Sequence, residues 1–296
     1  MDDSRPRLPP WLKVRLPSTE ALRTTGRLLR SNGLHTVCEG ARCPNQGECW
    51  GAGTATVLIL GDTCTRACRF CAVKKGRPGG EADGGEPARV ATAVAASGLA
   101  YVVLTSVDRD DLPDGGAAIY AATLRAIREA APGTRVEVLV PDYLGSALDT
   151  LLDAAPDVFA HNVEVVRRLT PSVRDRRASY DRSIEVLAAA ARARPGMPTK
   201  SSIMLGLGET RDEVVQTLAD LKAAGVRMVT LGQYLRPSTR HIAVERYLPP
   251  EEFEALHAVA AGMGFEFVAA GPLVRSSYRA AELFATSRIG KVSGTA

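Results

Sequence analysis

The sequence lacks any long hydrophobic run and any cluster of basic residues. No apolar stretch reaches the roughly 20 residues that a membrane helix needs. The opening segment, MDDSRPRLPPWLKVRLP, carries charges and prolines where a secretory signal needs an apolar core. The 37 lysines and arginines nearly balance the 33 aspartates and glutamates and are scattered along the chain. We therefore expect a cytoplasmic protein that binds neither a membrane nor nucleic acid.

Cysteine is absent from most of the chain. All six cysteines lie between residues 38 and 71. Disulfides are rare in large cytosolic proteins, so thiols gathered in one short region favour metal binding or redox chemistry. The composition, 45% apolar and 24% charged, is otherwise that of an ordinary globular chain.

From residue 54 onward, short β-branched runs alternate with alanine-rich helical stretches. Strands are predicted at 54–60, 101–107, 135–141, 158–164, 200–208 and 227–235. Helices are predicted at about 87–97, 116–131, 145–154, 180–194, 210–224 and 250–263. This alternation indicates a parallel sheet covered by helices. Six units are fewer than the eight of a closed barrel, so we predict an α/β fold with an open, partial (β/α)6 barrel; a doubly wound sheet is the alternative.

Three parts of the chain are expected. Residues 1–52, rich in proline, glycine and cysteine, form an N-terminal extension that a metal rather than an apolar core could order. Residues 53–265 form the barrel, and residues 266–296 form a C-terminal extension that continues an extended run, GFEFVAAGPLVRSSYRA. In either layout, ligands bind beyond the carboxyl ends of the strands.

One group of cysteines, Cys64, Cys68 and Cys71, has the spacing C-x3-C-x2-C in the stretch CTRACRFC, directly after the first predicted strand. Three thiolates can hold three corners of an iron–sulfur cluster and leave one iron open for another ligand. A structural zinc ion prefers four ligands, usually from paired C-x2-C units. The spacing therefore favours a cluster, with zinc or inert buried thiols as alternatives.

The other group, Cys38, Cys43 and Cys49, has the spacing C-x4-C-x5-C. This spacing is unusual for zinc, and by itself it fits a cluster or a structural metal equally well. The nearby C-x3-C-x2-C group favours the cluster.

These motifs also carry a resemblance to a known family. CTRACRFC resembles the signature of radical S-adenosylmethionine (SAM) enzymes. Taken with HTVCEGARCPNQGECW, RDDLPDGGA, HNVE, MLGLGE, QYLRPS and GPLVRSSYRA, the chain resembles the lipoyl synthase family over nearly its whole length. The C-x4-C-x5-C group and the RSSY motif are the most specific of these matches.

The resemblance implies two [4Fe–4S] clusters and SAM as cofactors. Cys64, Cys68 and Cys71 would hold the cluster that binds SAM and cleaves it to a 5′-deoxyadenosyl radical. A serine of RSSY, Ser277 by the family pattern, would complete the second cluster, which is consumed as the sulfur donor; spacing alone does not separate it from Ser276. Three cysteines complete that ligand set: Cys38, Cys43 and Cys49.

The implied reaction inserts two sulfur atoms, at C6 and C8, into an octanoyl chain linked to a lysine of a lipoyl carrier domain. The implied partners are octanoylated lipoyl domains of 2-oxoacid dehydrogenase E2 subunits, the glycine cleavage H protein, a ferredoxin or flavodoxin-type reductant, and a cluster-assembly protein.

Five further residues are candidates for binding SAM. Thr105 and Ser106 lie near the end of the second predicted strand and would act through exposed backbone groups, and Asn162 and Glu164 share one face of the fourth. Lys200, on the fifth strand, needs a partner if it is buried, and a carboxylate of SAM or of the substrate is one option. The ordinary alternative is that these residues belong to loops and to internal packing.

Four other polar residues are weaker candidates. Asp108, Asp110 and Asp111 form either a ligand loop or a solvated loop that caps a helix. The lone His161 is expected to be a packed residue.

Two other functions fit parts of the pattern. A methylthiotransferase is another radical SAM enzyme that inserts sulfur, but such enzymes act on RNA or ribosomal protein and usually append a separate binding domain, and none is visible in the sequence. A non-catalytic zinc protein would need a fourth ligand for each cysteine group.

Overall fold

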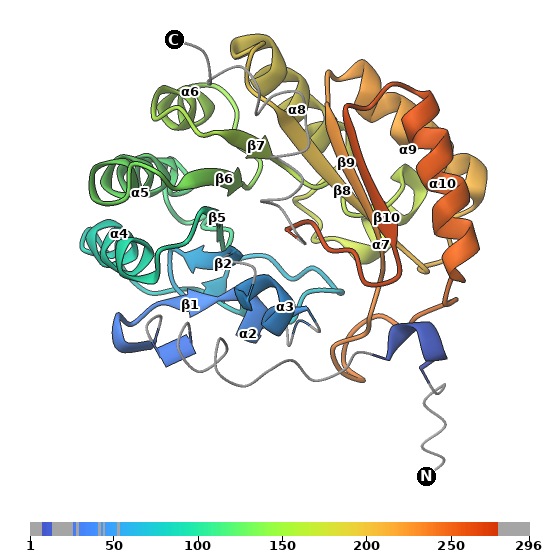
Figure 1. The fold of residues 1–296 in the computed structure, drawn as a ribbon, viewed down its shortest axis with the longest axis horizontal. Helices are drawn as coiled ribbons and strands as arrows, with labels where there is room; N and C mark the ends of the chain where they lie inside the picture. Colours follow the sequence, from blue (N-terminus) through green and yellow to red (C-terminus); the bar gives the residue numbers. More distant parts are fainter. Residues whose placement is uncertain are drawn as a thin grey trace.

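The computed structural model describes residues 8–13, 26–27, 30–40, 43, 45–51 and 54–277. In this part of the chain, six parallel strands form a curved sheet in the spatial order β2-β5-β6-β7-β8-β9 (Figure 1). Their bounds are β2 Thr54–Ile59, β5 Tyr101–Ser106, β6 Arg135–Leu139, β7 Val158–Ala160, β8 Thr199–Leu205 and β9 Met228–Gln233. All six were predicted from the sequence.

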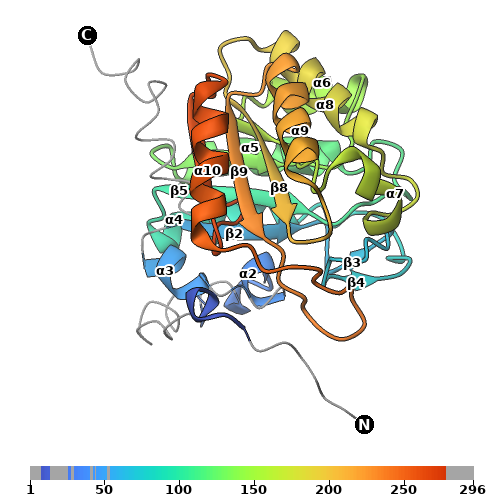
Figure 2. The same cartoon turned by 90° about the vertical axis from the view of Figure 1, so that its right-hand side faces the viewer.

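Helices cover the outer face of this sheet (Figures 1 and 2). They are α4 Glu86–Ser97, α5 Ala117–Ala130, α6 Ser146–Asp153, α8 Tyr180–Ala193, α9 Arg211–Ala223 and α10 Pro250–Gly262. A doubly wound sheet reverses its strand order at a switch point, whereas this order never reverses. Right-handed crossovers then place every helix on the same side. The prediction of an open partial barrel is confirmed.

The sheet continues beyond the six strands at both edges. β1, His35–Thr36, pairs antiparallel with β2, and β10, Phe267–Gly271, pairs parallel with β9. In the described ranges β1 and β10 are the two ends of the sheet, which therefore stays open. Each end strand comes from an extension outside the predicted barrel, so both extensions are built onto the barrel wall.

Local signals explain where several helices begin and end. Asp114 accepts hydrogen bonds from the backbone N–H groups of Gly116 and Ala118 at the start of α5. Thr210 and Glu213 form a reciprocal capping box at the start of α9. These caps satisfy N–H groups that lack partners within the helix.

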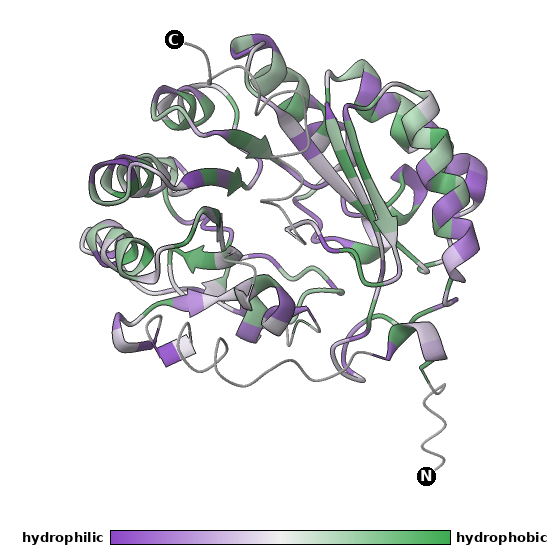
Figure 3. Ribbon diagram, in the orientation of Figure 1, coloured by the Kyte–Doolittle hydropathy of each residue, from purple (hydrophilic) through white to green (hydrophobic). Residues whose placement is uncertain are grey.

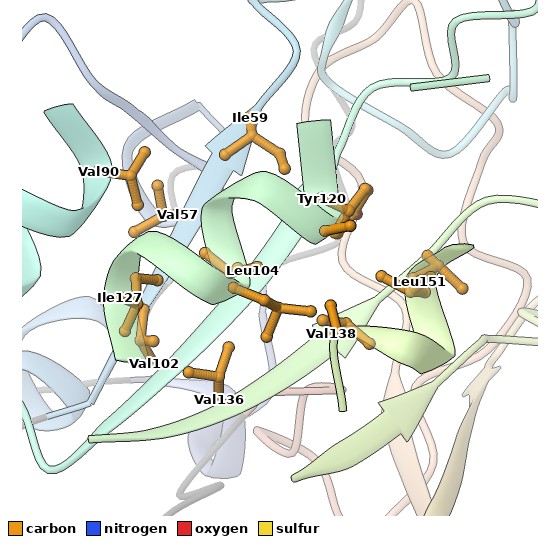
Figure 4. Packing of buried hydrophobic residues seen from close by; sticks show 14 of the residues in the cluster. Val57, Ile59, Val90, Val102, Leu104, Tyr120, Ile127, Val136, Val138 and Leu151 are labelled. Carbon is orange, nitrogen blue, oxygen red and sulfur yellow. The ribbon is translucent and has the colours of Figure 1, made fainter. Parts of the chain in front are cut away.

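Apolar residues fill the layer between the strands and the outer helices. Val57 and Leu104 of the sheet pack with Tyr120 and Ile127 of α5, and all four are fully buried (Figure 4). Hydrophilic residues gather on the outward faces of the helices (Figure 3). Because side chains alternate along a strand, Thr54 and Thr56, on either side of Ala55, face the barrel interior.

A buried ion pair occupies the interior near the amino ends of the strands. Lys200 Nζ lies 2.8 and 2.9 Å from the two carboxylate oxygens of Glu137, and both side chains are only 1% exposed. The Tyr101 hydroxyl donates to the same carboxylate at 2.9 Å. The structure therefore gives Lys200 a protein partner, where the sequence suggested a carboxylate of SAM or of the substrate.

We expect Lys200→Met to lower the free energy of unfolding by about 3–5 kcal/mol, because it leaves the Glu137 charge buried without its partner. Anaerobic urea denaturation followed by circular dichroism measures this loss. The double variant Lys200→Met/Glu137→Gln should recover most of it, since the pair is neutralised and Tyr101 keeps an acceptor. A single-variant loss below about 1 kcal/mol would contradict a structural role for this pair.

Two features of the fold differ from the sequence prediction. β7 ends at Ala160, although a strand was predicted to residue 164. The chain leaves the ladder where His161 hydrogen-bonds Val140 O at 2.8 Å and Ser183 Oγ at 3.0 Å, which also confirms that this histidine is packed. Several short elements were not predicted: η1 Pro10–Leu12, α2 Val37–Gly40, α3 Gln46–Gly51, β3 Thr63–Cys64, β4 Lys74–Lys75, η2 Arg167–Leu169 and α7 Thr170–Val173.

Among the described residues, no helix has the length and apolarity needed to cross a bilayer.

Candidate active site

Cys64, Cys68 and Cys71, here called the first site, lie in the loop that follows β2. The pKa of each thiol is raised to about 11, mainly by burial, and a neighbouring thiol contributes to each rise: Cys68 acts on Cys64, Cys71 on Cys68, and Cys64 on Cys71. The three thiols therefore lie within electrostatic reach of one another. Thiolates held this close together need a cation, and metal binding displaces their protons.

Backbone N–H groups point at the sulfurs of the first site. Arg66 N and Asp108 N lie 3.4 and 3.3 Å from Cys64 Sγ. Asp175 N lies 3.3 Å from Cys68 Sγ. Donors of this kind stabilise the negative charge of a cluster-bound thiolate and tune the cluster's potential.

Arg66, inside the C-x3-C segment, anchors this loop to the carboxyl ends of β5 and β6. Its guanidinium is 11% exposed and lies 2.9 Å from Asp110 and 3.3 Å from Asp108, and it also pairs with Asp142. The structure thus gives Asp108 and Asp110 partners in the loop, while Asp111 pairs with Arg109. The helix-capping role considered for these aspartates belongs instead to Asp114.

Segments that follow β7 and β9 hold the other side of the loop. Arg69 N donates to Val173 O at 2.8 Å, and Ala67 N donates to Asp175 Oδ2 at 2.8 Å. His241 Nε2 lies 3.1 Å from Cys71 O. The loop is therefore fixed on several sides before any ligand binds.

Of the residues predicted to bind SAM, Glu164 lies at the first site. Its charge raises the pKa of both Cys68 and Cys71, and burial raises its own. Asn162 Nδ2 donates to Glu164 Oε1 at 3.3 Å. Glu164 also has a left-handed backbone, with φ of 67°, a strained conformation of the kind found at functional sites.

The other three residues predicted to bind SAM have surroundings that differ from those of Glu164 and Asn162. Ser106 ends β5 at the carboxyl edge of the sheet, just before the loop that pairs with Arg66. Thr105 Oγ1 donates to Leu139 O at 3.0 Å and so serves the sheet. Lys200 lies near the opposite, amino end of the strands.

The other three cysteines line a pocket together with residues from distant parts of the chain. Cys38, on α2, and Cys49, on α3, line it together with Cys43. Thr54 and Thr56 of β2 line it from the sheet side, and residues of the C-terminal extension complete it: Arg275 and Ser277. Here this group of three cysteines and Ser277 is called the second site. Burial raises the pKa of the Cys38 thiol, and the nearby Cys43 raises it further.

Ser277 enters this pocket on a segment that crosses the barrel interior. This segment, residues 272–277, is here called the strap (Figure 1). Asn45 Nδ2 donates to Leu273 O at 2.6 Å, and Thr56 Oγ1 donates to Ser277 Oγ at 3.0 Å. Ser277 lines the pocket and Ser276 does not, which favours Ser277 as the ligand. Tyr278, the last residue of RSSY, lies outside the described residues.

Close approach of the strap to β9 depends on Gly232. A Cβ atom at this position would lie 2.0 Å from Val274 O and 3.0 Å from Val274 C, both backbone atoms. Only glycine therefore admits the strap at its observed position. This role of Gly232 was missed from the sequence, because a glycine in a strand signals a close approach without naming its partner.

We expect Gly232→Ala to displace the strap and, in the sulfur insertion that the family resemblance implies, to lower the yield of product roughly a hundredfold, since small misplacements of reacting groups have effects of that size. Formation of 5′-deoxyadenosine should persist, because the first site is held by other segments. Gly262→Ala is the matched control, since its new Cβ meets nothing within 4 Å. Equal product from both variants would contradict the role of this contact.

The donor sets of both sites suit clusters. All six cysteines are free thiols, as expected for the composition. In the described part of the chain, no three cysteine, histidine or carboxylate side chains converge on one metal-ion position. A four-iron cluster bound at its corners holds its thiolates further apart than a single zinc ion does, and each site offers three cysteine thiols to such a cluster.

Comparison with protein families gives two matches. Residues 58–221 match the Radical SAM superfamily, and residues 1–43 match the N-terminal domain of lipoyl synthase of the radical SAM family. The first match covers more than half of the chain and spans the first site.

Solved structures share the fold. HydG from Carboxydothermus hydrogenoformans, an FeFe-hydrogenase maturase, superposes with a TM-score of 0.52 at 13% identity, covering 89% of this chain and 77% of its own. HemN from Escherichia coli, a coproporphyrinogen III oxidase and radical SAM enzyme, gives 0.51 at 12% identity, covering 71% and 53%. At such low identity these likenesses establish the fold alone.

Curated relatives are much closer in sequence. The chain is 57% identical to the lipoyl synthase of Thermus thermophilus, over 93% of this chain and 86% of that protein. It is 59% identical to the lipoyl synthase of Pyrobaculum arsenaticum, over 94% and 95%. The Deinococcus radiodurans lipoyl synthase is 53% identical, over 94% and 85%. With identity of this extent added to the two cysteine sites in a partial barrel, the chain belongs to the lipoyl synthase family of radical SAM enzymes.

Proposed function

We propose that the first site binds a [4Fe–4S] cluster through Cys64, Cys68 and Cys71, with SAM on the iron that these thiolates leave open. When bound, this cluster supplies the electron that cleaves SAM to the radical able to remove hydrogen from an unactivated alkyl carbon. The electrostatic interaction among the three thiols and the N–H donors to Cys64 and Cys68 support this assignment.

Polar groups beside the first site would orient SAM. Glu164, which acts electrostatically on two of the three thiols, is placed to accept hydrogen bonds from the amino group or the ribose hydroxyls. Asn162 donates a hydrogen bond to the Glu164 carboxylate, and Ser106 would offer its backbone at the carboxyl end of β5. Thr105 and Lys200 have protein partners and are not part of this proposal.

The second site would bind the other [4Fe–4S] cluster through its three cysteines and Ser277. The single observation that carries this proposal is the strap, which brings Ser277 into the pocket of the N-terminal cysteines. A serine oxygen is a harder and poorer ligand for iron than a thiolate, so it can be released when the cluster gives up sulfur. Serine would therefore be a suitable fourth ligand for a cluster that donates sulfur.

Membership of the family makes the chain a radical SAM enzyme that inserts sulfur, with SAM and [4Fe–4S] clusters as cofactors and a lipoyl carrier protein as substrate. We infer that sulfur is inserted at C6 and C8 of the carrier-bound octanoyl chain. We also infer that lipoyl domains of E2 subunits and the H protein are the carriers, and that a ferredoxin or flavodoxin is the reductant.

The contributions of different parts of the chain to the two sites support a division of the chain into three units. Residues 1–52 supply the cysteines of the second site and β1, residues 53–265 supply the barrel and the first site, and residues 266–296 supply β10 and the strap. Residues 278–296 of the last unit lie outside the described part of the chain.

Mass spectrometry of an octanoylated carrier domain tests the reaction. The domain is incubated anaerobically with the iron-loaded enzyme, SAM and a reductant. The expected product has gained two sulfur atoms. A protein with its full iron complement, about eight irons per chain, that forms 5′-deoxyadenosine but adds no sulfur would refute the substrate assignment.

A further inference from the structure

Thr56 lies in the middle of β2, faces the barrel interior and is only 5% exposed. Its hydroxyl donates to Ser277 Oγ at 3.0 Å. Burying a hydroxyl without a hydrogen-bond partner costs free energy. Ser277 supplies the partner that the buried Thr56 hydroxyl requires. In the sequence, Thr56 is only one of several β-branched residues that predict a strand.

The same residue also lies in the pocket of the second site. Thr56 lines this pocket together with Cys38, from the N-terminal extension, and Ser277, from the C-terminal extension. Thr56 is therefore placed beside ligands from both extensions.

We propose that Thr56 is the positioning residue for the fourth ligand: its hydroxyl donates the hydrogen bond that directs Ser277 Oγ, rather than Ser276, into the pocket of the three cysteines. The inference rests on the proposed function, in which Ser277 is that ligand.

The chemistry of the two hydroxyls fits this role. A serine oxygen that has lost its proton to become a ligand can only accept hydrogen bonds, so its neighbour must donate. Thr56 already donates in that direction. A hydrogen bond to a charged oxygen is stronger than one between neutral groups, so the contact should hold the serine most firmly in its ligand form.

The test uses the full chain reconstituted anaerobically with iron and sulfide. Thr56→Val removes the hydroxyl and keeps the branched shape, Thr56→Ser keeps the hydroxyl, and Ser277→Ala removes the ligand itself. The readouts are the Mössbauer spectrum and the rate at which a chelator removes iron from the second site. Iron retained at the first site shows that each variant is folded, and Thr56→Ala provides a second hydroxyl-free variant if valine disturbs the strand.

We expect Thr56→Val to release the second-site iron roughly tenfold faster than the wild type, with a spectrum shifted toward that of Ser277→Ala. Thr56→Ser should match the wild type. The inference is overturned if Thr56→Val behaves as wild type while Ser277→Ala is altered, or if Thr56→Ser is as impaired as Thr56→Val. An unaltered Ser277→Ala variant would instead overturn the ligand assignment, and this inference with it.

Discussion

Cys68→Ala is expected to abolish formation of 5′-deoxyadenosine from SAM. Cys68 Sγ accepts a hydrogen bond from Asp175 N and lies within electrostatic reach of the other two thiols of the first site. Three of the six cysteines form the proposed ligand set of the first site, and the other three line the pocket of the second site. Loss of one ligand therefore leaves too few thiolates to hold the cluster.

Chromatography of an anaerobic reaction with SAM and a reductant measures this loss. Iron analysis should fall from about eight to about four per chain, because the second site keeps its cluster. Ala67→Ser is the control in the same loop, since the Ala67 side chain is exposed and only its backbone holds the loop. Wild-type amounts of 5′-deoxyadenosine from Cys68→Ala would refute the assignment of the first site.

Cys43→Ala should have a different consequence: 5′-deoxyadenosine still forms, but no lipoyl group is made. Cys43 lines the pocket that Ser277 completes, and its charge acts on Cys38. Its removal disrupts the proposed sulfur source and leaves the first site with all three thiols. Radical formation and sulfur insertion therefore separate in this variant.

Mass spectrometry of the carrier domain and assay of 5′-deoxyadenosine on the same sample report both steps. Gly40→Ala, between Cys38 and Cys43 in the sequence, is the matched control because its new Cβ meets nothing within 4 Å. If Cys43→Ala made lipoyl groups at the normal yield, the second site would not be the sulfur donor.

Local patterns predicted most of the barrel. Each of the six strands and six outer helices is encoded by a continuous run with its own period and its own start and stop signals, so their bounds agree with the structure to within a few residues, except at the end of β7. The C-x3-C-x2-C segment lies in one loop, and the thiols that it places together are close in sequence. Family membership further excludes the alternative of a non-catalytic zinc protein.

The second site could not be predicted by the same reasoning. Its serine is brought to the cysteines by contacts between residues more than 200 positions apart: Asn45 with Leu273, and Thr56 with Ser277. No periodic pattern encodes such a contact, so only the family resemblance pointed to Ser277. The roles of Thr56 and Gly232 emerge only when the strap is seen against β2 and β9.

Lys200 illustrates a related limit. The sequence indicated that this lysine, if buried, needs a negative partner. It did not indicate that Glu137, from a strand two places away in the sheet, supplies that charge inside the barrel. Choosing between a protein partner and a ligand requires the relative register of separate strands, which local patterns leave open.

The origin of the inserted sulfur tests the whole account most directly. The enzyme is reconstituted with ³⁴S-labelled sulfide, freed of unbound sulfide, and allowed one turnover with SAM and an octanoylated carrier domain. If the cluster held by the strap serine and its three cysteines is the donor, mass spectrometry should find ³⁴S at both inserted positions, and Cys43→Ala should give no labelled product. Product carrying unlabelled sulfur, formed at the normal yield, would contradict the account.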